Sequence, residues 1–251
     1  MELPDEFENR TIRTIVIRHW QQDAVLYHIF LRLNTGSVQL SPQELRNALH
    51  PGPFADFIDQ YSADSPMLRK ILGIDRPDFR MRDAELLLRY YAFRNFLPRY
   101  AGSMKDFLDE TTQELNENWV DVAPEIEVQA EQFEQAVELA YDVFGPDSVF
   151  RKWKDGRFGS RFNRAVYDIV MFYFCRPEIM EDVQRHASDV AQAFVDLSES
   201  QPGFIDALES TTKSLTATFT RLEMWAQALE QVLDSGVPVP YRVDSRIAIS
   251  D

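Results

Sequence analysis

Hydrophobic residues recur every three to four positions along most of the chain, and this spacing predicts a mainly α-helical fold. The expected helices cover residues 21–33, 41–49, 54–62, 66–72, 83–97, 103–118, 125–144, 161–174, 178–199 and 212–234. Residues 11–19 are rich in β-branched side chains and predict a β-strand. The two ends of the chain, 1–10 and 235–251, show neither period and are expected to be irregular.

The helix expected at 41–49 has clear start and end signals. Ser41 suits the N-cap, Pro42 suits the first helical position, and Glu44 can complete a capping box with Ser41. The sequence Pro-Gly-Pro at 51–53 then ends the helix. The helix expected at 83–97 is apolar on nearly all sides, so we predict that it is central and buried.

A change in pattern near residues 119–124 predicts a boundary between two structural parts. A polar stretch there ends in Pro124, and a new helical period follows it. We therefore expect a first domain over residues 1–118 and a helical domain over residues 119–251.

Charge is distributed unevenly, which restricts the partners of the chain. The net charge is −15, and residues 101–150 contain one lysine against thirteen acidic residues. A solvated helix face is the ordinary explanation of such a charge run. Because this segment would repel a phosphate backbone, a nucleic-acid surface would have to lie elsewhere or on another chain.

The remaining composition predicts a cytoplasmic protein without a disulfide, a metal centre or a membrane contact. The single cysteine, Cys175, lies in the apolar run VMFYFC and is expected to be a small buried residue. His19, His28, His50 and His186 are scattered and form no HExxH motif, so they predict no metal site. The sequence shows neither a signal-peptide pattern nor an apolar run long enough to cross a bilayer.

Residues 30–49, FLRLNTGSVQLSPQELRNAL, mix strong hydrogen-bonding groups with apolar surface. Arg32 falls at the edge of the apolar arc of its helix, where a guanidinium needs an anionic or carbonyl partner. In a structural interpretation, Arg32 pairs with Glu44 and the helix caps fix the turn between the two helices. In a functional interpretation, Arg32 or Arg46 binds a phosphate together with the turn and the next helix start. The turn lacks the GxxxxGK[ST] pattern of a P-loop.

Two other charged groups have structural and functional interpretations. Glu85 and Arg89 are one helical turn apart and are expected to form a partly buried ion pair. A basic cluster with two aromatic residues is either a solvated loop or a surface for nucleic acid or a protein partner. Its members are Arg151, Lys152, Trp153, Lys154, Arg157, Phe158, Arg161 and Arg164.

Several phrases of the sequence resemble those of one protein family. They are IFLRLNTGSVQLSPQELRNAL (29–49), PGPF (51–54), RMRDAELLLRYYAF (80–93), YAGSMKDFL (100–108), FGPDSVFRKW (144–153) and FNRAVYDIVM (162–171). In this order they resemble the ParB-like domain at the N-terminus of GmrSD-type modification-dependent restriction enzymes. The resemblance covers most of residues 3–175.

This resemblance implies the C-terminal part of a ParB-like α+β domain over residues 1–118, followed by a helical domain. It also implies a role in defence against foreign or modified DNA by NTP-dependent restriction. The DGQQR motif and the HNH-type nuclease domain of the family do not occur in this sequence. We therefore expect a truncated or split member that contributes half of an NTP- and DNA-processing site and is inactive alone. A partner chain or a preceding segment would supply DGQQR, and NTP and DNA would bind to the completed assembly, with no cofactor in this chain alone.

The residues of the implied half-site are those that match the family phrases. The ligand-binding candidates are Arg32, Asn34, Thr35, Gly36, Gln43, Glu44, Arg46 and Asn47, and the catalytic residues are unknown. Arg80, Asp83, Glu85 and Arg89 match the later phrase, with a structural or a binding role. The alternative function, from a different class, is a non-enzymatic helical interaction or regulatory protein.

Overall fold

The computed structural model describes residues 39–209, 214–244 and 246–249, together with residues 11, 14, 16, 18, 25 and 29. The described residues form eleven α-helices and two small two-stranded sheets, which confirms the predicted mainly helical class. The chain divides into two units, residues 1–40 and 41–251. The strand predicted at 11–19 and the helix predicted at 21–33 belong to the first unit and lie mostly outside the described residues.

The second unit holds all of the regular elements described here. Its α-helices are α3 (Pro42–Leu49), α4 (Pro53–Asp64), α5 (Pro66–Leu72), α6 (Arg82–Phe96), α7 (Met104–Glu117), α8 (Trp119–Phe144), α9 (Arg164–Phe174), α10 (Pro177–Arg185), α11 (Ala187–Ser200), α12 (Pro202–Glu209) and α13 (Leu215–Glu230). A 3₁₀ helix, η2 (Leu97–Arg99), follows α6. The strands are β1 (Trp153–Lys154), β2 (Arg157–Phe158), β3 (Pro240–Val243) and β4 (Arg246–Ile249). β1 pairs with β2 and β3 pairs with β4, both antiparallel.

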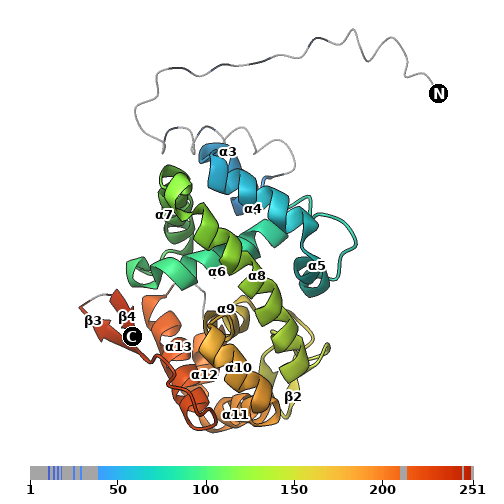
Figure 1. Cartoon of the computed structure of the whole chain (residues 1–251), viewed down its shortest axis with the longest axis vertical. Coiled ribbons are helices and arrows are strands. Elements are labelled where there is room, and N and C mark those ends of the chain that lie inside the picture. Colours follow the sequence, from blue (N-terminus) through green and yellow to red (C-terminus); the bar gives the residue numbers. More distant parts are fainter. Residues whose placement is uncertain are drawn as a thin grey trace, which may run out of the picture. The chain divides into compact units, whose positions relative to one another are not determined.

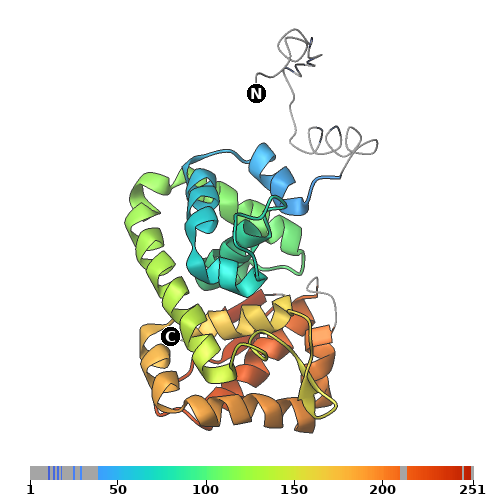
Figure 2. The same ribbon diagram turned by 90° about the vertical axis from the view of Figure 1, so that its right-hand side faces the viewer.

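Helix α8 connects two groups of helices within this unit (Figures 1 and 2). It contacts α4, α5 and α7 in one group and α9, α10 and α11 in the other. Helix α6 also belongs to both groups, because it packs against α4, α5, α7 and α9. One hydrophobic core extends through both groups, from Phe54 to Ile247. The domain boundary that we predicted at 118/119 coincides with the start of α8, and it separates helices that share this core.

The central position predicted for the helix near 83–97 is confirmed by the burial of α6. Most of its residues between Asp83 and Phe93 are buried, because neighbouring helices cover it on several sides. The hydroxyl of Tyr90 donates to the carbonyl oxygen of Gln129 at 2.8 Å, and that of Tyr91 donates to the carbonyl of Ile126 at 2.9 Å. These two bonds satisfy buried hydroxyls and fix α6 against α8.

A charged group lies inside this core. Arg89 of α6 donates to both carboxylate oxygens of Asp168 on α9, at 3.0 and 2.5 Å, and each side chain is 2% exposed. Arg221 of α13 lies 3.5 Å from the same carboxylate, but its guanidinium nitrogens have no hydrogen bond to a described residue. The predicted Glu85–Arg89 pair is wrong. Arg89 turns into the core, whereas the carboxylate of Glu85 lies 3.2 Å from Arg164.

The electrostatic states of the two buried arginines differ. Burial lowers the pKa of Arg89, but the charge and the hydrogen bonds of Asp168, together with the charges of Glu85 and Tyr167, raise it, and the net shift is upward. Burial also lowers the pKa of Arg221, and the charge of Arg89 lowers it further, so the net shift is downward in spite of Asp168. The Asp168 carboxylate thus lies beside two guanidinium groups, and it accepts hydrogen bonds only from Arg89 among the described arginines.

Three segments differ from the elements that the sequence predicted. The helix expected at 178–199 is two helices, α10 and α11, which meet at His186. Residues 153–158 form the β1–β2 hairpin, and 202–209 form α12, neither of which was predicted. The tail, expected to be irregular, contains the β3–β4 hairpin. Its turn places Asp244 at φ 54°, a conformation that aspartate tolerates, and Ile247 on β4 is fully buried.

The predicted start of α8 at residue 125 is also wrong. The helix begins at Trp119, and Pro124 lies inside it. A proline there removes the hydrogen bond that would reach the carbonyl of Val120, one turn earlier. Val120 is 90% exposed, so water can satisfy its carbonyl oxygen and the helix continues.

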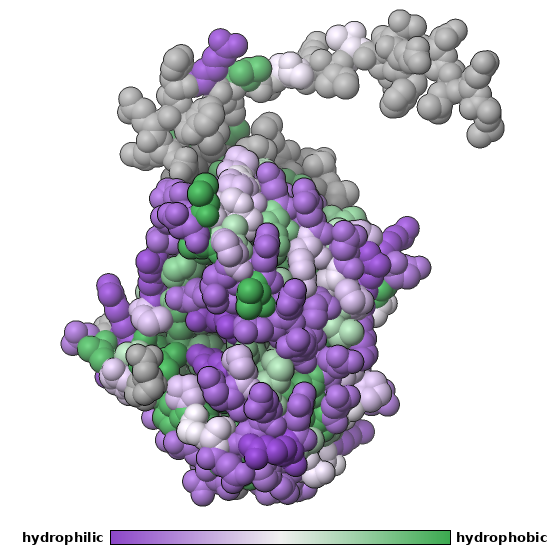
Figure 3. All heavy atoms as spheres, in the orientation of Figure 1, coloured by the Kyte–Doolittle hydropathy of each residue, from purple (hydrophilic) through white to green (hydrophobic). Residues whose placement is uncertain are grey.

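The surface is mostly hydrophilic on the face shown in Figure 3, where hydrophobic residues form small separate patches. Cys175 is fully buried, which confirms its predicted role as a small core residue. Among the described helices, none combines the length and the apolar character needed to cross a membrane.

Candidate functional site

Glu44, one of the predicted ligand-binding residues, is held by contacts within the chain. Its N–H donates to the Ser41 hydroxyl at 3.0 Å, and the Ser41 N–H donates to the Glu44 carboxylate at 2.6 Å. The predicted capping box is therefore confirmed. The guanidinium of Arg80 lies 3.2 Å from the same carboxylate, and the Ser41 hydroxyl donates to the carbonyl oxygen of Arg80 at 2.9 Å. These contacts fix the start of α3 to the segment that precedes α6.

Arg46 and Gln43 are both buried and bind one another. Nη1 of Arg46 donates to Oε1 of Gln43 at 2.5 Å, and Nε donates to the carboxylate of Asp109 on α7 at 2.6 Å. Lys105 also lies 2.7 Å from Asp109. The enclosed space beside Arg46 and the half-buried Asn47 holds about 10 Å³, which is the size needed by one water molecule. Gln43 and Arg46 thus form a clasp between α3 and α7, and the space beside Arg46 is too small for a phosphate group.

The other half of that prediction lies outside the described residues. Arg32, Asn34, Thr35 and Gly36 all precede residue 39. Gln43, Glu44, Arg46 and Asn47 lie together on α3. That they share a binding site with the turn at residues 34–36 stays a prediction. The same holds for the predicted Arg32–Glu44 pair.

The basic cluster is tied to acidic residues of α11 and α12. The ammonium groups of Lys152 and Lys154 each lie 3.0 Å from the Glu209 carboxylate, and Nε1 of Trp153 donates to Glu199 at 2.9 Å. The hydrogen bonds from the two lysines lower the pKa of Glu209, with that from Lys152 the largest cause. These contacts fasten the β1–β2 hairpin to the helices and neutralise part of the cluster.

A groove of about 860 Å³ runs between α11 and α13. We call it the α11–α13 groove. Its apolar residues are half-buried and form the floor; they are Ala193, Leu197, Met224, Ala228 and Val232. Its polar residues lie at the rim; they include Asp189, Gln192, Asp196, Gln227 and Gln231, all exposed. The lining includes no lysine or arginine, so its formal charges at neutral pH are acidic apart from any proton on His186.

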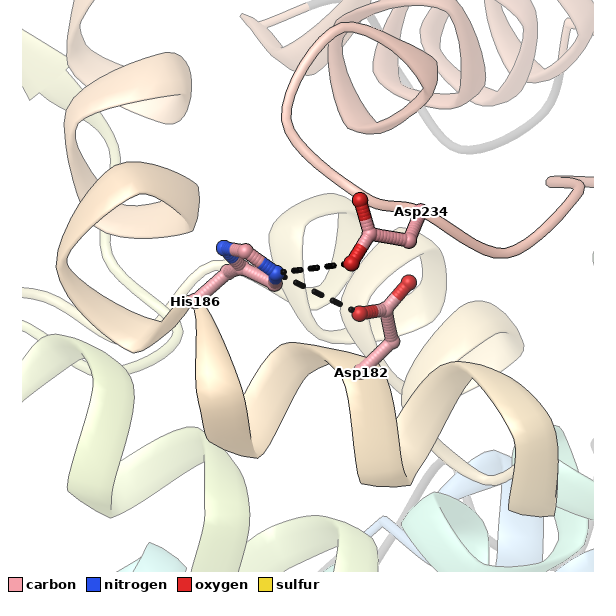
Figure 4. Close-up of side chains that lie close together, drawn as sticks. All are labelled: Asp182, His186 and Asp234. Atoms are coloured by element: carbon pink, nitrogen blue, oxygen red, sulfur yellow. Dashed lines mark hydrogen bonds and ion pairs between the residues drawn. The ribbon is translucent and has the colours of Figure 1, made fainter.

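His186 lies at one end of this groove and faces two aspartates (Figure 4). Its Nε2 is 3.5 Å from Oδ1 of Asp182, one turn earlier, and 3.4 Å from Oδ2 of Asp234, in the loop after α13. Nδ1 lies 3.7 Å from the Asp189 carboxylate. Asp182 is fully buried, and its Oδ2 accepts the Ser235 N–H at 2.6 Å. Burial raises the pKa of Asp182, but the bonds from Ser235 and the charge of Arg185 hold it below its usual value.

Sequence reasoning missed both the groove and the His186 cluster. The spacing of Asp182 and His186, four residues apart, was visible but is common in helices. Asp234 lies 48 residues beyond His186 in the sequence, and only the packing of α13 on α11 brings the loop to the histidine. The lining of the groove likewise comes from two helices that the sequence does not pair.

No protein-family model matches the chain, and the searches of curated proteins and of solved structures give no match either.

Proposed function

We propose that this chain is an interaction or regulatory protein that binds a basic amphipathic segment of a partner in the α11–α13 groove. The observation that carries this proposal is the arrangement of the groove lining. Half-buried apolar side chains form the floor, and the exposed rim carries Asp189, Asp196 and several glutamines. An amphipathic helix binds such a surface by placing its apolar face on the floor.

The chemistry of the lining selects the partner. Leu197, Met224 and Val232 pack against the hydrophobic core and leave part of their surface open to the groove. Methionine adapts its shape to different apolar side chains, so Met224 suits a floor that receives a helix. The acidic rim attracts lysine and arginine and repels acidic segments, and the net charge of −15 strengthens this selection.

Binding to a defined probe tests this proposal. A fluorescently labelled amphipathic peptide of leucine and lysine is titrated with the full chain, and anisotropy gives the Kd. We expect the variant Ala193→Arg, which fills the floor, to raise the Kd at least about tenfold. Ala101→Arg is the matched control, because Ala101 is exposed and does not line the groove. Equal binding by the wild type and Ala193→Arg would refute the groove as the binding surface.

The charge of the rim is tested separately. Asp196→Asn should weaken binding and reduce its dependence on salt, because each lost carboxylate removes an attraction that salt screens. Asp142→Asn removes an exposed aspartate outside the groove and serves as the matched control. A peptide in which glutamate replaces lysine should not bind. If it binds as tightly as the lysine peptide, charge does not select the partner.

The second candidate is the half-site of a split GmrSD-type restriction system, and it is favoured by the order of the matching phrases in residues 29–171. In this proposal residues 1–118 are the later part of a ParB-like domain, and a DGQQR-bearing segment completes the site for NTP and DNA. Coding sequence for such a segment directly upstream of this chain would support it. Hydrolysis of NTP or cleavage of DNA by the purified chain alone would contradict the expected inactivity of the half-site.

The role of Arg46 tests the second candidate. In the split-site proposal, Arg46→Ala weakens nucleotide binding by the completed assembly while the lone chain remains as stable as the wild type. If Arg46 instead serves to hold α3 against α7, the same change lowers the melting temperature of the lone chain. The contacts of Arg46 with Gln43 and Asp109 support the second outcome.

A further inference from the structure

We infer that Asp182, His186 and Asp234 bind a divalent transition-metal cation, with zinc as the best fit. The three residues offer one imidazole nitrogen and two carboxylate oxygens, and these atoms all lie within 4.8 Å of one another. They come from α10, from the junction of α10 and α11, and from the loop after α13 (Figure 4). The inference is independent of the peptide-binding proposal, since it rests on the ligand atoms alone.

The spacing of the ligand atoms fits tetrahedral coordination. Zinc binds histidine nitrogen and carboxylate oxygen at about 2.0–2.1 Å, which separates neighbouring ligands by roughly 3.3–3.4 Å. Nε2 of His186 lies 3.5 Å from Asp182 and 3.4 Å from Asp234, close to this separation. The Asp234 side chain is 73% exposed, so its carboxylate can rotate to complete the third edge. A fourth position then faces solvent and can hold water.

The carboxylates around His186 favour a cation at its imidazole ring. A neutral imidazole has one N–H, yet carboxylates face both of its nitrogens, with Asp189 beside Nδ1 at 3.7 Å. A lone pair on Nε2 that points at two carboxylates is unfavourable unless a proton or a metal ion lies between them. With a metal on Nε2, the N–H on Nδ1 points toward Asp189, which is the arrangement that usually orients a metal-binding histidine.

Zinc suits these ligands better than magnesium or calcium. The last two bind oxygen almost exclusively, whereas imidazole favours zinc and its transition-metal neighbours. Two carboxylates also balance the charge of a divalent ion. Asp182 uses Oδ2 to accept the Ser235 N–H at 2.6 Å, which orients the carboxylate and leaves Oδ1 for the metal.

Arg185 is the competitor for this position. One of its nitrogens lies 2.9 Å from the same Oδ1 of Asp182, and the other lies 3.9 Å from Asp234. The side chain is 62% exposed, so it can move into solvent when a metal binds. This arrangement predicts that removal of the guanidinium tightens metal binding, an effect opposite to that of removing a ligand.

The experiment is a calorimetric titration of the EDTA-treated, dialysed full chain with zinc chloride. We expect one zinc ion per chain. His186→Ala and Asp234→Asn should each raise the Kd at least about tenfold, and Arg185→Gln should lower it. His50→Ala is the matched control, because His50 lies on a segment far from His186 in the sequence and is not part of the cluster. Asp182 is left unchanged, since its burial and its bond to Ser235 make that variant prone to unfold.

Two results would overturn the inference. One is wild-type binding of zinc that His186→Ala leaves unchanged, which would place the metal elsewhere. The other is the absence of zinc binding in both the wild type and Arg185→Gln, which would make the cluster a set of ion pairs. A thermal melt gives a second readout: zinc should raise the Tm of the wild type, because it links α10 to the loop after α13, and at the same zinc concentration should raise that of Asp234→Asn less.

Discussion

The buried carboxylate of Asp168 is the position where one substitution should affect the fold most clearly. Asp168→Asn keeps the volume of the side chain and removes its charge. Arg89 then loses a carboxylate that it contacts at 3.0 and 2.5 Å, and Arg221 loses the anion 3.5 Å away. Both guanidinium groups would remain in a core where they are almost completely hidden from water.

The expected loss follows from the burial of the pair. Removing one partner of a buried ion pair costs about 3–5 kcal/mol, because the other charge stays buried without compensation. For a chain of this size, such a loss lowers the Tm by roughly 6–20 °C. Arg221→Met is not expected to destabilise the fold. It removes a buried cation without hydrogen bonds to described residues and leaves the Arg89–Asp168 pair complete. We expect the free energy of unfolding to be unchanged or raised by about 1 kcal/mol.

Urea unfolding followed by circular dichroism measures these differences. The slope of the free energy against urea should be the same in all variants, so that midpoints report stability. The double variant Asp168→Asn/Arg221→Met is the decisive member of the series. It leaves one unpaired guanidinium instead of two, so it should be more stable than Asp168→Asn alone. The reasoning is refuted if Asp168→Asn costs less than about 1 kcal/mol, or if the second change adds to the loss.

Three further predictions concern the clasp, the hairpins and the dependence on pH. Arg46→Ala should lower the free energy of unfolding by about 3 kcal/mol in urea titrations, and an equal effect of the half-buried Asn47→Ala would contradict the clasp. Glu209→Gln should lower the Tm by roughly 2 °C at pH 7. Because the folded-state pKa of Glu209 is lowered, its contribution is complete above its unfolded pKa of about 4.3 and is lost as the pH falls further, so melts of the two proteins should converge in acid. Ile247→Ala should cost about 2–4 kcal/mol, since the side chain is fully buried, and a similar cost for the exposed Tyr241→Ala would show that the β3–β4 hairpin is not held by its core contact.

The sequence predicted the elements well where the signals are local. The capping box of Ser41 and Glu44, the proline at the start of α3 and the burial of α6 on nearly all sides follow from residues within a few positions of one another. The predictions failed where distant groups decide the outcome. The helix at 178–199 breaks at His186, whose side chain meets Asp234, and the tail forms a hairpin because Ile247 has a place in the core.

The candidate site on α3 shows which part of a site depends on packing. The half-site stays a prediction, because the sequence shows which groups of α3 can form hydrogen bonds and not which partners they meet. The fold gives Arg46 a carboxylate 63 residues away, on α7. It also builds the α11–α13 groove and the His186 cluster from segments that no short motif connects.

The sequence by itself determined that the chain is mainly helical, that α6 is central and that α3 begins at a capping box. Each of these follows from the helical period and from hydrogen bonds between near neighbours. The tertiary structure alone decided the charge pairs: Arg89 meets Asp168 across 79 residues, and His186 meets Asp234 across 48. Such pairs depend on how the helices pack, since a buried charge pairs with an opposite charge that the packing places within a few ångströms of it.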